Sequence, residues 1–279
     1  MIKRADLTPA IQQLQPLPAS VTRLAKIVAS ESSSLDDIRE VVQFDPVLTG
    51  RLLRAANSAY SGSSRAIATV KDALLRMGTG TVLALAVGSH VRRSMMDACP
   101  GYGLAEGVLW RHGVAAALTA ELLQTQTRLA IPPESLTASL LHDVGKLVLS
   151  RALTPELMRE IRQAQEDQHT NRLYAEREIL GFHHGELGGD VSDYWELPEP
   201  IRAGIVHHHS PSQTSGIMAY ITCFANLTAE AIENTTGRLP AVPDDPEPVY
   251  MRLGMGFGDP EQVRDLVASR LDEVRERYQ

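Results

Sequence analysis

The spacing of apolar positions predicts helices along most of the chain. Ser34 and Asp37 form a capping-box pair that predicts a helix over Leu35–Gln43. Thr69 predicts the start of another helix, over Val70–Met77. No stretch alternates apolar and polar residues convincingly, as a half-buried strand does. The pattern therefore predicts an all-α protein.

Pro and Gly positions divide the remaining pattern into segments. The break at residues 99–103 is expected to separate an N-terminal helical lobe, residues 10–98, from a second helical lobe, residues 104–235. A Pro- and Gly-rich crossing segment, residues 237–259, then leads into a C-terminal helix, so that residues 236–279 form a third part packed on the second lobe. Further helices are predicted over residues 46–59, 81–95, 104–127, 135–142, 155–166, 172–180, 186–195, 200–207, 215–233 and 261–278.

Composition supports the helical class and excludes one kind of partner. Hydrophobic residues make up 43% of the 279 positions and aromatic residues only 5%. The apolar residues are mostly Ala, Leu, Val and Ile, of which Ala and Leu favour helices. The formal net charge is −7, and no dense Lys/Arg cluster is present. Nucleic-acid binding through phosphate neutralisation is therefore not expected.

Cysteine use and hydropathy predict a soluble cytoplasmic protein. Cys99 and Cys223 are far apart and form no CxxC pair, as in a reducing compartment. Asp6 stands where a signal peptide needs its apolar stretch. The most apolar run, Thr81–Val91, is too short to span a bilayer. We expect no membrane segment.

The most informative feature is a His-Asp pair with histidines before and after it. Imidazole and carboxylate are the usual ligands of hydrolytic divalent metals such as zinc, iron and manganese. Gly145 allows a tight turn that would point both side chains of the pair at one ion, and Lys146 could place a charge beside a phosphate. The set comprises His112, His142-Asp143, His183-His184 and His207–His209.

Each of these residues also has an ordinary structural interpretation. A single His on a helix is more often a core or surface residue than a ligand, and His90 and His169 receive that interpretation. The triplet His207–His209 could be a solvated loop, because Ser210-Pro211-Ser212 follows it. An exposed turn lysine is likewise the default for Lys146. Helix ends turned toward one another would nevertheless form a pocket between helices, a common place for a metal.

These residues, in this order, resemble the HD superfamily of metal-dependent phosphohydrolases, and the sequence around them resembles its HDOD branch. The resemblance spans about residues 10–230, and the Asp-Pro and Asn-Ser-Ala-Tyr blocks are diagnostic in combination. The blocks that carry it are Leu17–Ala19, Phe44–Leu48, Leu53–Tyr60, Ile67–Gly78, Trp110–His112, Leu140–Lys146, Gly181–Gly188, Trp195–Pro198 and Ile205–His209.

The resemblance implies an all-α fold of two lobes, the second an HD-like bundle, in a regulator of bacterial signalling. The HDOD family is usually regarded as regulatory and often lacks some metal ligands. The resemblance further implies a degenerate site for iron, manganese or zinc, with Lys146 as the phosphate contact if the site is active. The implied metal residues are His112, His142, Asp143, His184, His208, His209 and Asn226.

Two departures from the HD enzymes concern the chemistry. Asn226 stands where those enzymes have a late aspartate, and a neutral amide oxygen is a weaker ligand. The related HD-GYP phosphodiesterases carry Gly-Tyr-Pro after their paired histidines, where this chain has Ser210–Gln213. Gly101-Tyr102-Gly103 lies elsewhere and is not that motif. Cyclic di-GMP hydrolysis is therefore disfavoured.

Two main functional hypotheses follow. The first is a non-catalytic signal-transduction module that binds a protein partner, or a nucleotide-like small ligand in the cleft. The alternative is a metal-dependent phosphohydrolase or phosphodiesterase that uses the His-Asp set. A third and weaker hypothesis is pH sensing by a metal-free histidine cluster. Asn57–Arg65 could present a partner surface, but we favour a structural role for Asn57 and Tyr60, whose side chains would fix the turn.

Overall fold

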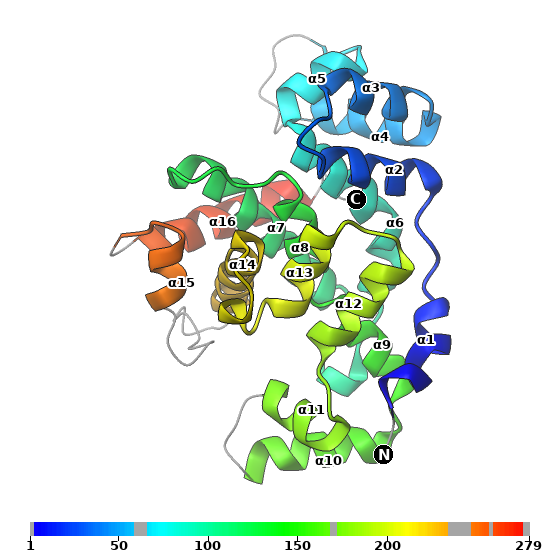
Figure 1. Ribbon diagram of the computed structural model, residues 1–279, viewed down its shortest axis with the longest axis vertical. Coiled ribbons are helices and arrows are strands. Elements are labelled where there is room, and N and C mark those ends of the chain that lie inside the picture. The colour runs from blue at the N-terminus through cyan, green and yellow to red at the C-terminus, as the bar shows by residue number, and fades with distance from the viewer. Residues whose placement is uncertain (1–2, 59–65, 168–171, 234–246, 257–258, 276–279) are drawn as a thin grey trace.

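The computed structural model describes residues 3–58, 66–167, 172–233, 247–256 and 259–275. Within these ranges it contains helices and no strand, which confirms the all-α class (Figure 1). The α-helices are α1 (Thr8–Gln12), α2 (Ala19–Val28), α3 (Leu35–Gln43), α4 (Pro46–Ala56), α5 (Val70–Met77), α6 (Thr79–Met96), α7 (Val108–Gln126), α8 (Ser135–Leu141), α9 (Val144–Ala152), α10 (Pro155–Asp167), α11 (Arg172–Leu180), α12 (His184–Tyr194), α13 (Glu199–His207), α14 (Ile217–Glu233), α15 (Glu247–Arg252) and α16 (Asp259–Arg275).

Side-chain caps place the helix starts in the N-terminal part. Ser34 accepts a hydrogen bond from the backbone N–H of Asp37, whose carboxylate accepts one from Ser34 in return. Asp45 caps α4 by accepting from two backbone N–H groups, and Thr69 caps α5. These starts agree with the predictions because a cap is a local interaction. Helix α4 ends at Ala56, earlier than predicted, and Ala59 lies outside the described residues.

Five segments differ from the predictions. Helices α1 and α2 were not predicted. Helix α7 begins at Val108 rather than residue 104, because Gly107 adopts the left-handed conformation (φ 77°) just before it. Helix α15 interrupts the segment predicted to be irregular. The residues after the His-Asp pair do not form an isolated turn but continue at once as α9.

Gly145 lies inside α9 and is required there by packing rather than by a turn. The backbone φ angle of Gly145 is not positive, so the residue does not need the left-handed conformation. A Cβ at this position would collide with the backbone carbonyl of His184 and lie 2.7 Å from the backbone nitrogen of Gly188, both in α12. The glycine therefore lets α9 and α12 approach closely, which brings the His-Asp pair near His184.

Gly145→Ala is expected to destabilise the protein by about 2 kcal/mol, because the methyl group must push two packed backbones apart. Gly50→Ala is the matched control: Gly50 lies in α4 with nothing within 4 Å of its added Cβ, so this change should be neutral or stabilising. Urea unfolding of both variants measures the difference. Equal stability of the two would contradict the close-packing role of Gly145.

Helices α7, α8, α13 and α14 form the centre of the second half of the chain. Helix α7 packs along α8, α14 and α16, while α12 packs between α9 and α13 (Figure 1). The facing side chains are buried throughout, with Leu123, Leu140 and Phe224 at 0% exposure. This packing turns the ends of α8, α12 and α13 toward one region.

Helix α6 contacts helices of both halves. It packs against α2, α4 and α5 on one side and against α7, α8 and α9 on the other, while α1 packs against α9 and α12. The division at residues 98 and 104 stays a prediction. Among the described residues no single helix is long and apolar enough to cross a membrane; α5 and α6 pass that test only as a pair, bent by 105°.

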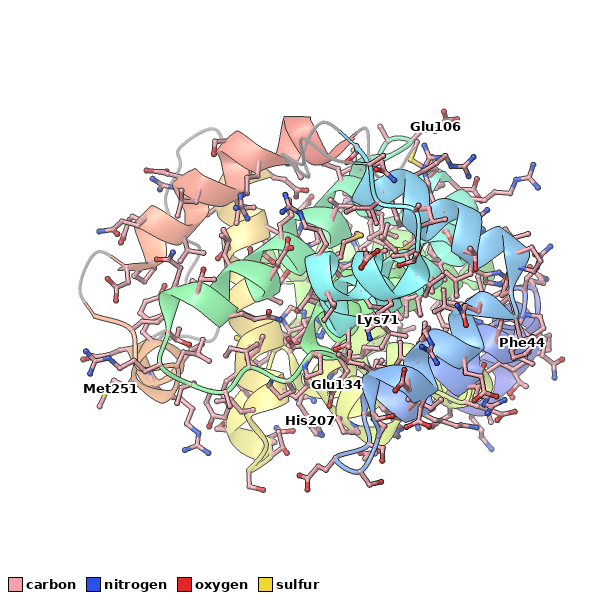
Figure 2. The ribbon with its side chains drawn as sticks, turned by 90° about the horizontal axis from the view of Figure 1, so that it is seen from above. Phe44, Lys71, Glu106, Glu134, His207 and Met251 are labelled. Carbon is pink, nitrogen blue, oxygen red and sulfur yellow. The ribbon has the colours of Figure 1, made fainter. Side chains whose placement is uncertain are left out.

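The N-terminal helices carry the most exposed large apolar side chain. Phe44, at the end of α3, is 83% exposed and lies at the periphery of the molecule (Figure 2). Asn57 has the structural role that we favoured: its amide donates to the carbonyl oxygens of Leu53 and Ile67, and its oxygen accepts from the N–H of Ile67. Tyr60 lies outside the described residues.

Candidate metal centre

The His-Asp pair occupies the junction between α8 and α9. His142 is the C-cap of α8 and Asp143 is the N-cap of α9. Both are buried, at 0% and 1% exposure. A junction without an intervening loop holds the two side chains in fixed directions, and the carboxylate of Asp143 lies among several imidazole rings.

A first group of donor atoms surrounds Oδ2 of Asp143. His112, in the first turns of α7, places its Nε2 3.2 Å from Nε2 of His142. Oδ1 of Asn226, from α14, lies 3.0 Å from Nε2 of His112 and 3.1 Å from Nε2 of His142. Oδ2 of Asp143 lies 3.5 Å from each. These four side chains come from three separate parts of the chain.

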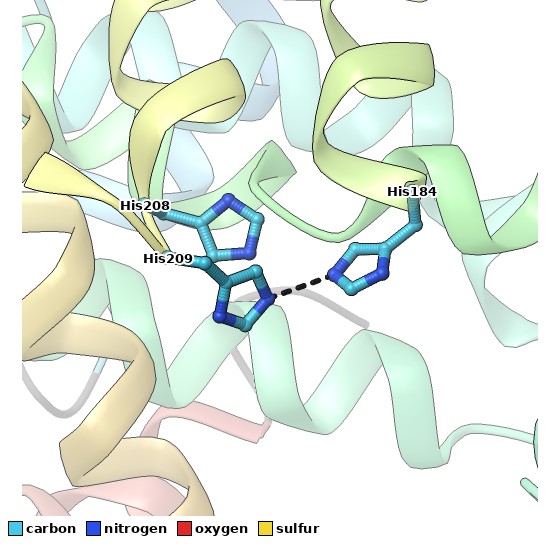
Figure 3. Close-up of side chains that lie close together, drawn as sticks. All are labelled: His184, His208 and His209. Atoms are coloured by element: carbon cyan, nitrogen blue, oxygen red, sulfur yellow. Dashed lines mark hydrogen bonds between the residues drawn. The ribbon is translucent and has the colours of Figure 1, made fainter. Parts of the chain in front are cut away.

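A second group surrounds the other oxygen, Oδ1, of Asp143. Nε2 of His184, at the start of α12, lies 3.3 Å from Oδ1, and Nε2 of His208 lies 3.8 Å from it. His209 joins them with its Nε2 2.9 Å from that of His184 (Figure 3). Asp143 thus presents one oxygen to each group. All seven predicted metal residues lie in these two groups.

Two rings, those of His142 and His208, are oriented by backbone carbonyl oxygens outside the groups. Nδ1 of His142 lies 2.7 Å from the carbonyl oxygen of Ser139. Nδ1 of His208 lies 2.6 Å from the carbonyl oxygen of Ile205. Because a carbonyl only accepts, both Nδ1 atoms carry hydrogen and donate, and the neutral rings turn Nε2 lone pairs inward. Nε2 of His208 and Oδ1 of Asp143 have no hydrogen-bond partner. Buried lone pairs that converge in this way favour a cation between them.

The separations fit the dimensions of a coordinated ion. Ligand atoms about 2.1 Å from one ion stand about 3.0–3.4 Å apart. The contacts around Oδ2 run from 3.0 to 3.5 Å. In its neutral form His142 carries its one proton on Nδ1, so that Nε2 of His142 and Oδ1 of Asn226 both present lone pairs to the same point. The residues therefore suit a divalent metal with nitrogen and oxygen ligands.

Lys146 neutralises part of the charge of Asp143. Its Nζ lies 2.5 Å from Oδ2, in the first group. Burial would raise the pKa of Asp143, but the ammonium group of Lys146 opposes this and helps to hold the pKa well below the usual range. Burial likewise opposes the charge of Lys146, but Asp143 outweighs it and raises the lysine pKa. Lys146 contacts Oδ2 of Asp143 and leaves Oδ1 without a hydrogen-bond partner.

Glu176 is a buried supporting residue that the sequence did not reveal. Its Oε2 accepts from Nδ1 of His184 (2.8 Å) and from the backbone N–H of His184 (2.9 Å), while Oε1 accepts from the Tyr102 hydroxyl (2.7 Å). Burial would raise the pKa of Glu176, but His184 and Tyr102 hold it at about 2. Arg172 lies beside this carboxylate and over the Tyr102 ring. A carboxylate behind a ligand histidine fixes its tautomer.

Two further acidic residues support the first group from α14. Glu230 accepts a hydrogen bond of 3.0 Å from Nδ2 of Asn226, so the Asn226 amide oxygen faces the histidines. Oε2 of Glu233 lies 3.2 Å from Nδ1 of His112. Burial lowers the pKa of His112, but Glu233 and Asp143 outweigh it and raise the pKa. The spacing of Asn226 and Glu230 at i, i+4 was the one sequence signal for this support.

The remaining histidines stay outside both groups. His183 is the N-cap of α12: its Nδ1 accepts from the N–H of Gly185, and burial lowers the pKa of His183 to about 3. His207 ends α13, half-buried. His90 contacts the carbonyl oxygen of Gln15. His169 lies outside the described residues.

Comparison with known proteins gives both a family and a fold. The family model for the HDOD domain matches residues 14–211. An uncharacterized protein of Treponema pallidum (strain Nichols) is 22% identical over 236 residues, which are 83% of this chain and 45% of that protein. The chain therefore spans about half the length of this curated relative.

Two solved structures illustrate the likeness in fold. A Shewanella amazonensis SB2B protein provisionally named a phosphohydrolase has a TM-score of 0.64 and 22% identity, over 98% of this chain and 96% of that one. A Marinobacter aquaeolei VT8 protein provisionally assigned to signal transduction has a TM-score of 0.73 and 20% identity, over 99% of this chain and 65% of that one. At such identities the likeness concerns the fold.

Proposed function

The chain belongs to the HDOD domain family, and on that premise we propose that it is a signal-transduction protein whose second half binds divalent metal between α7, α8, α12, α13 and α14. The strongest support is that histidine Nε2 atoms gather around both carboxylate oxygens of Asp143, with their lone pairs directed into the same small space. Metal binding would order the helix junction that carries these residues, and a protein partner would bind the ordered form preferentially.

The charges around the site favour metal binding over entry of an anion. Glu230 and Glu233 lie on the more exposed side of the first group, and the side chain of Glu233 is 33% exposed. These carboxylates attract a divalent cation and repel a phosphate that approaches the same side. The ligands themselves are almost fully buried, with exposures of 0–6% for His112, His142, Asp143, His184, His208 and Asn226. A binding role is therefore our first choice.

Phosphoester hydrolysis is the second candidate, and Lys146 is the observation that favours it. Its side chain is 19% exposed and lies beside Asp143, where an ammonium group could contact a phosphoryl oxygen. A divalent metal bound there would supply an activated water and polarise that oxygen. His112, His142, Asp143 and Asn226 would hold one ion, and His184, His208, His209 and Asp143 a second.

Metal analysis followed by a substrate panel tests both candidates. Protein purified without a chelator or a His-tag should contain near-stoichiometric iron, manganese or zinc by plasma mass spectrometry. Protein that stays empty after reconstitution would overturn the metal-binding proposal. Turnover of a phosphoester that is lost in His142→Ala would replace the binding role with the hydrolase. Loaded protein inactive on the panel with manganese, iron, nickel and cobalt would support the binding role.

Asn226→Asp combined with Glu230→Gln is expected to tighten manganese binding about ten-fold, because it adds a charged ligand and keeps a neutral partner behind it. Asn226→Asp alone should gain less, since two carboxylates would then face each other. Glu230→Gln alone should weaken binding about ten-fold, as loss of a supporting partner does. Calorimetric titration with manganese measures all three; unchanged affinity in the double variant would remove Asn226 from the ligand set.

A further inference from the structure

A cavity lies apart from the histidine cluster, between the segment after α1 and helices α6 and α9. It has a volume of about 340 Å³, within the range of small-ligand sites. Its walls come from four segments: residues 13–15 after α1, the second half of α6, α9, and Trp195 at the end of α12. None of the predicted metal residues lines it.

The chemistry of the cavity is apolar at the base and cationic at the edge. Leu14, Val91 and Leu147 line it and are buried at 1–3% exposure. Arg93 is exposed and has no ion-pair or hydrogen-bond partner among the described residues, and Arg151 pairs with Asp97 at 2.8 Å. An edge with two guanidinium groups and one carboxylate is positive, in a chain whose net charge is −7. Guanidinium groups suit phosphate and carboxylate groups.

The backbone around the cavity is fixed by two hydrogen bonds. Trp195 donates from Nε1 to the carbonyl oxygen of Gln15 at 3.0 Å, and Nε2 of His90 contacts the same oxygen at 3.3 Å. Both His90 and Trp195 line the cavity. The segment after α1 is therefore held against α6 and α12, and the wall is built before any ligand arrives.

We propose that this cavity binds a small organic phosphate, with the phosphate group on Arg93 and Arg151 and an apolar body over Leu147. The volume accommodates a molecule of about the size of a nucleoside monophosphate. The apolar base gives such a molecule an advantage over inorganic phosphate, and the arginines give it an advantage over the uncharged nucleoside.

The position of the cavity couples it to the metal site. Helix α9 begins next to Asp143 and lines the cavity further along with Leu147 and Arg151. Helix α12 begins with His184 and ends next to Trp195. A ligand that shifts either helix along its axis changes the metal ligands at the other end. Coupling of this kind is reciprocal, so metal would change ligand affinity by the same factor. The coupling rests on the proposed metal centre, whereas the cavity itself does not.

Calorimetric titration of the full chain with AMP, adenosine and inorganic phosphate tests the proposal. AMP should bind at least ten-fold more tightly than either of the other probes, and Arg93→Gln should weaken AMP binding at least ten-fold. Arg54→Gln is the matched control, because Arg54 is an exposed arginine in α4 that does not line the cavity. No preference for AMP, or equal loss in the two variants, would overturn the cavity site.

Asp143→Asn separates this proposal from the metal centre. AMP binding that persists in Asp143→Asn and is lost in Arg93→Gln supports the cavity, whether or not the wild-type protein holds metal. AMP binding lost in Asp143→Asn but kept in Arg93→Gln would place AMP at the histidine cluster and overturn the proposal. A ratio of AMP affinities with and without manganese that differs from one would support the coupling, and a ratio of one would overturn it.

Discussion

Asp143→Asn is expected to abolish divalent-metal binding, with a loss of more than 100-fold in affinity. Among the residues that the structure describes, Asp143 alone contributes an oxygen to both groups of donor atoms, with Oδ2 facing His112 and His142 and Oδ1 facing His184. The amide keeps the shape of the side chain but removes the negative charge and presents one NH₂ group to a ligand position. Both metal positions should therefore be lost together.

Plasma mass spectrometry of the purified variant measures this loss directly, with Asp36→Asn as the matched control. Asp36 lies at the start of α3 with a side chain 73% exposed, so the same change there should leave metal content unaltered. Thermal unfolding in chelator is needed as well, because Asp143→Asn also leaves the ammonium of Lys146 without its partner. A folded variant that retains wild-type metal content would contradict the assignment of Asp143.

The helix starts were predictable wherever the signal was local. Ser34 and Thr69 each cap a helix through their own side chains, and each cap lies where the sequence placed it. Among the helices that were not predicted, α9 depends on a distant contact instead. Gly145 suggested a turn, but it serves the approach of α9 to α12, nearly forty residues away. Nothing near Gly145 in the sequence distinguishes these two uses of a glycine.

The ligand histidines were predictable, but the residues that orient them were not. His-Asp and His-His pairs are unusual enough to stand out, and the structure brings their predicted ligands together while His183 and His207 stay outside both groups. Glu176 and Tyr102 carry no such signal, because a glutamate in a helix and a tyrosine in a break are common. Their role arises only when α11 and the turn at residues 100–102 fold against His184.

Supporting residues also offset the replacement of the usual aspartate by Asn226, and they too could be recognised only in the structure. The sequence shows an amide where HD enzymes have a carboxylate, and this alone suggested weaker metal binding. The structure adds Glu230 behind the amide and Glu233 behind His112, so negative charge remains close to the first group. Divalent-metal affinity depends on the charge of the supporting residues as well as on the ligands.

Glu176→Gln is expected to destabilise metal-free protein by about 3 kcal/mol at pH 6. The buried carboxylate accepts from Tyr102 and twice from His184, and it pairs with Arg172. A neutral amide offers a single acceptor oxygen and places NH₂ against another donor, which leaves buried groups unsatisfied. Glu160→Gln is the control, since Glu160 is an exposed glutamate in α10.

The pH dependence of stability distinguishes this charge from simple packing. The pKa of Glu176 is about 2 in the folded protein, against 4.5 for an unperturbed glutamate. A lowered folded-state pKa gives stability that is complete above pH 4.5 and is lost as pH falls from 4.5 toward 2. The difference between wild type and Glu176→Gln, measured by urea unfolding in chelator, should therefore be constant from pH 7 to 5 and shrink steadily from pH 4.5 to 3. A difference that does not change with pH would show that Glu176 acts through its shape and not through its charge.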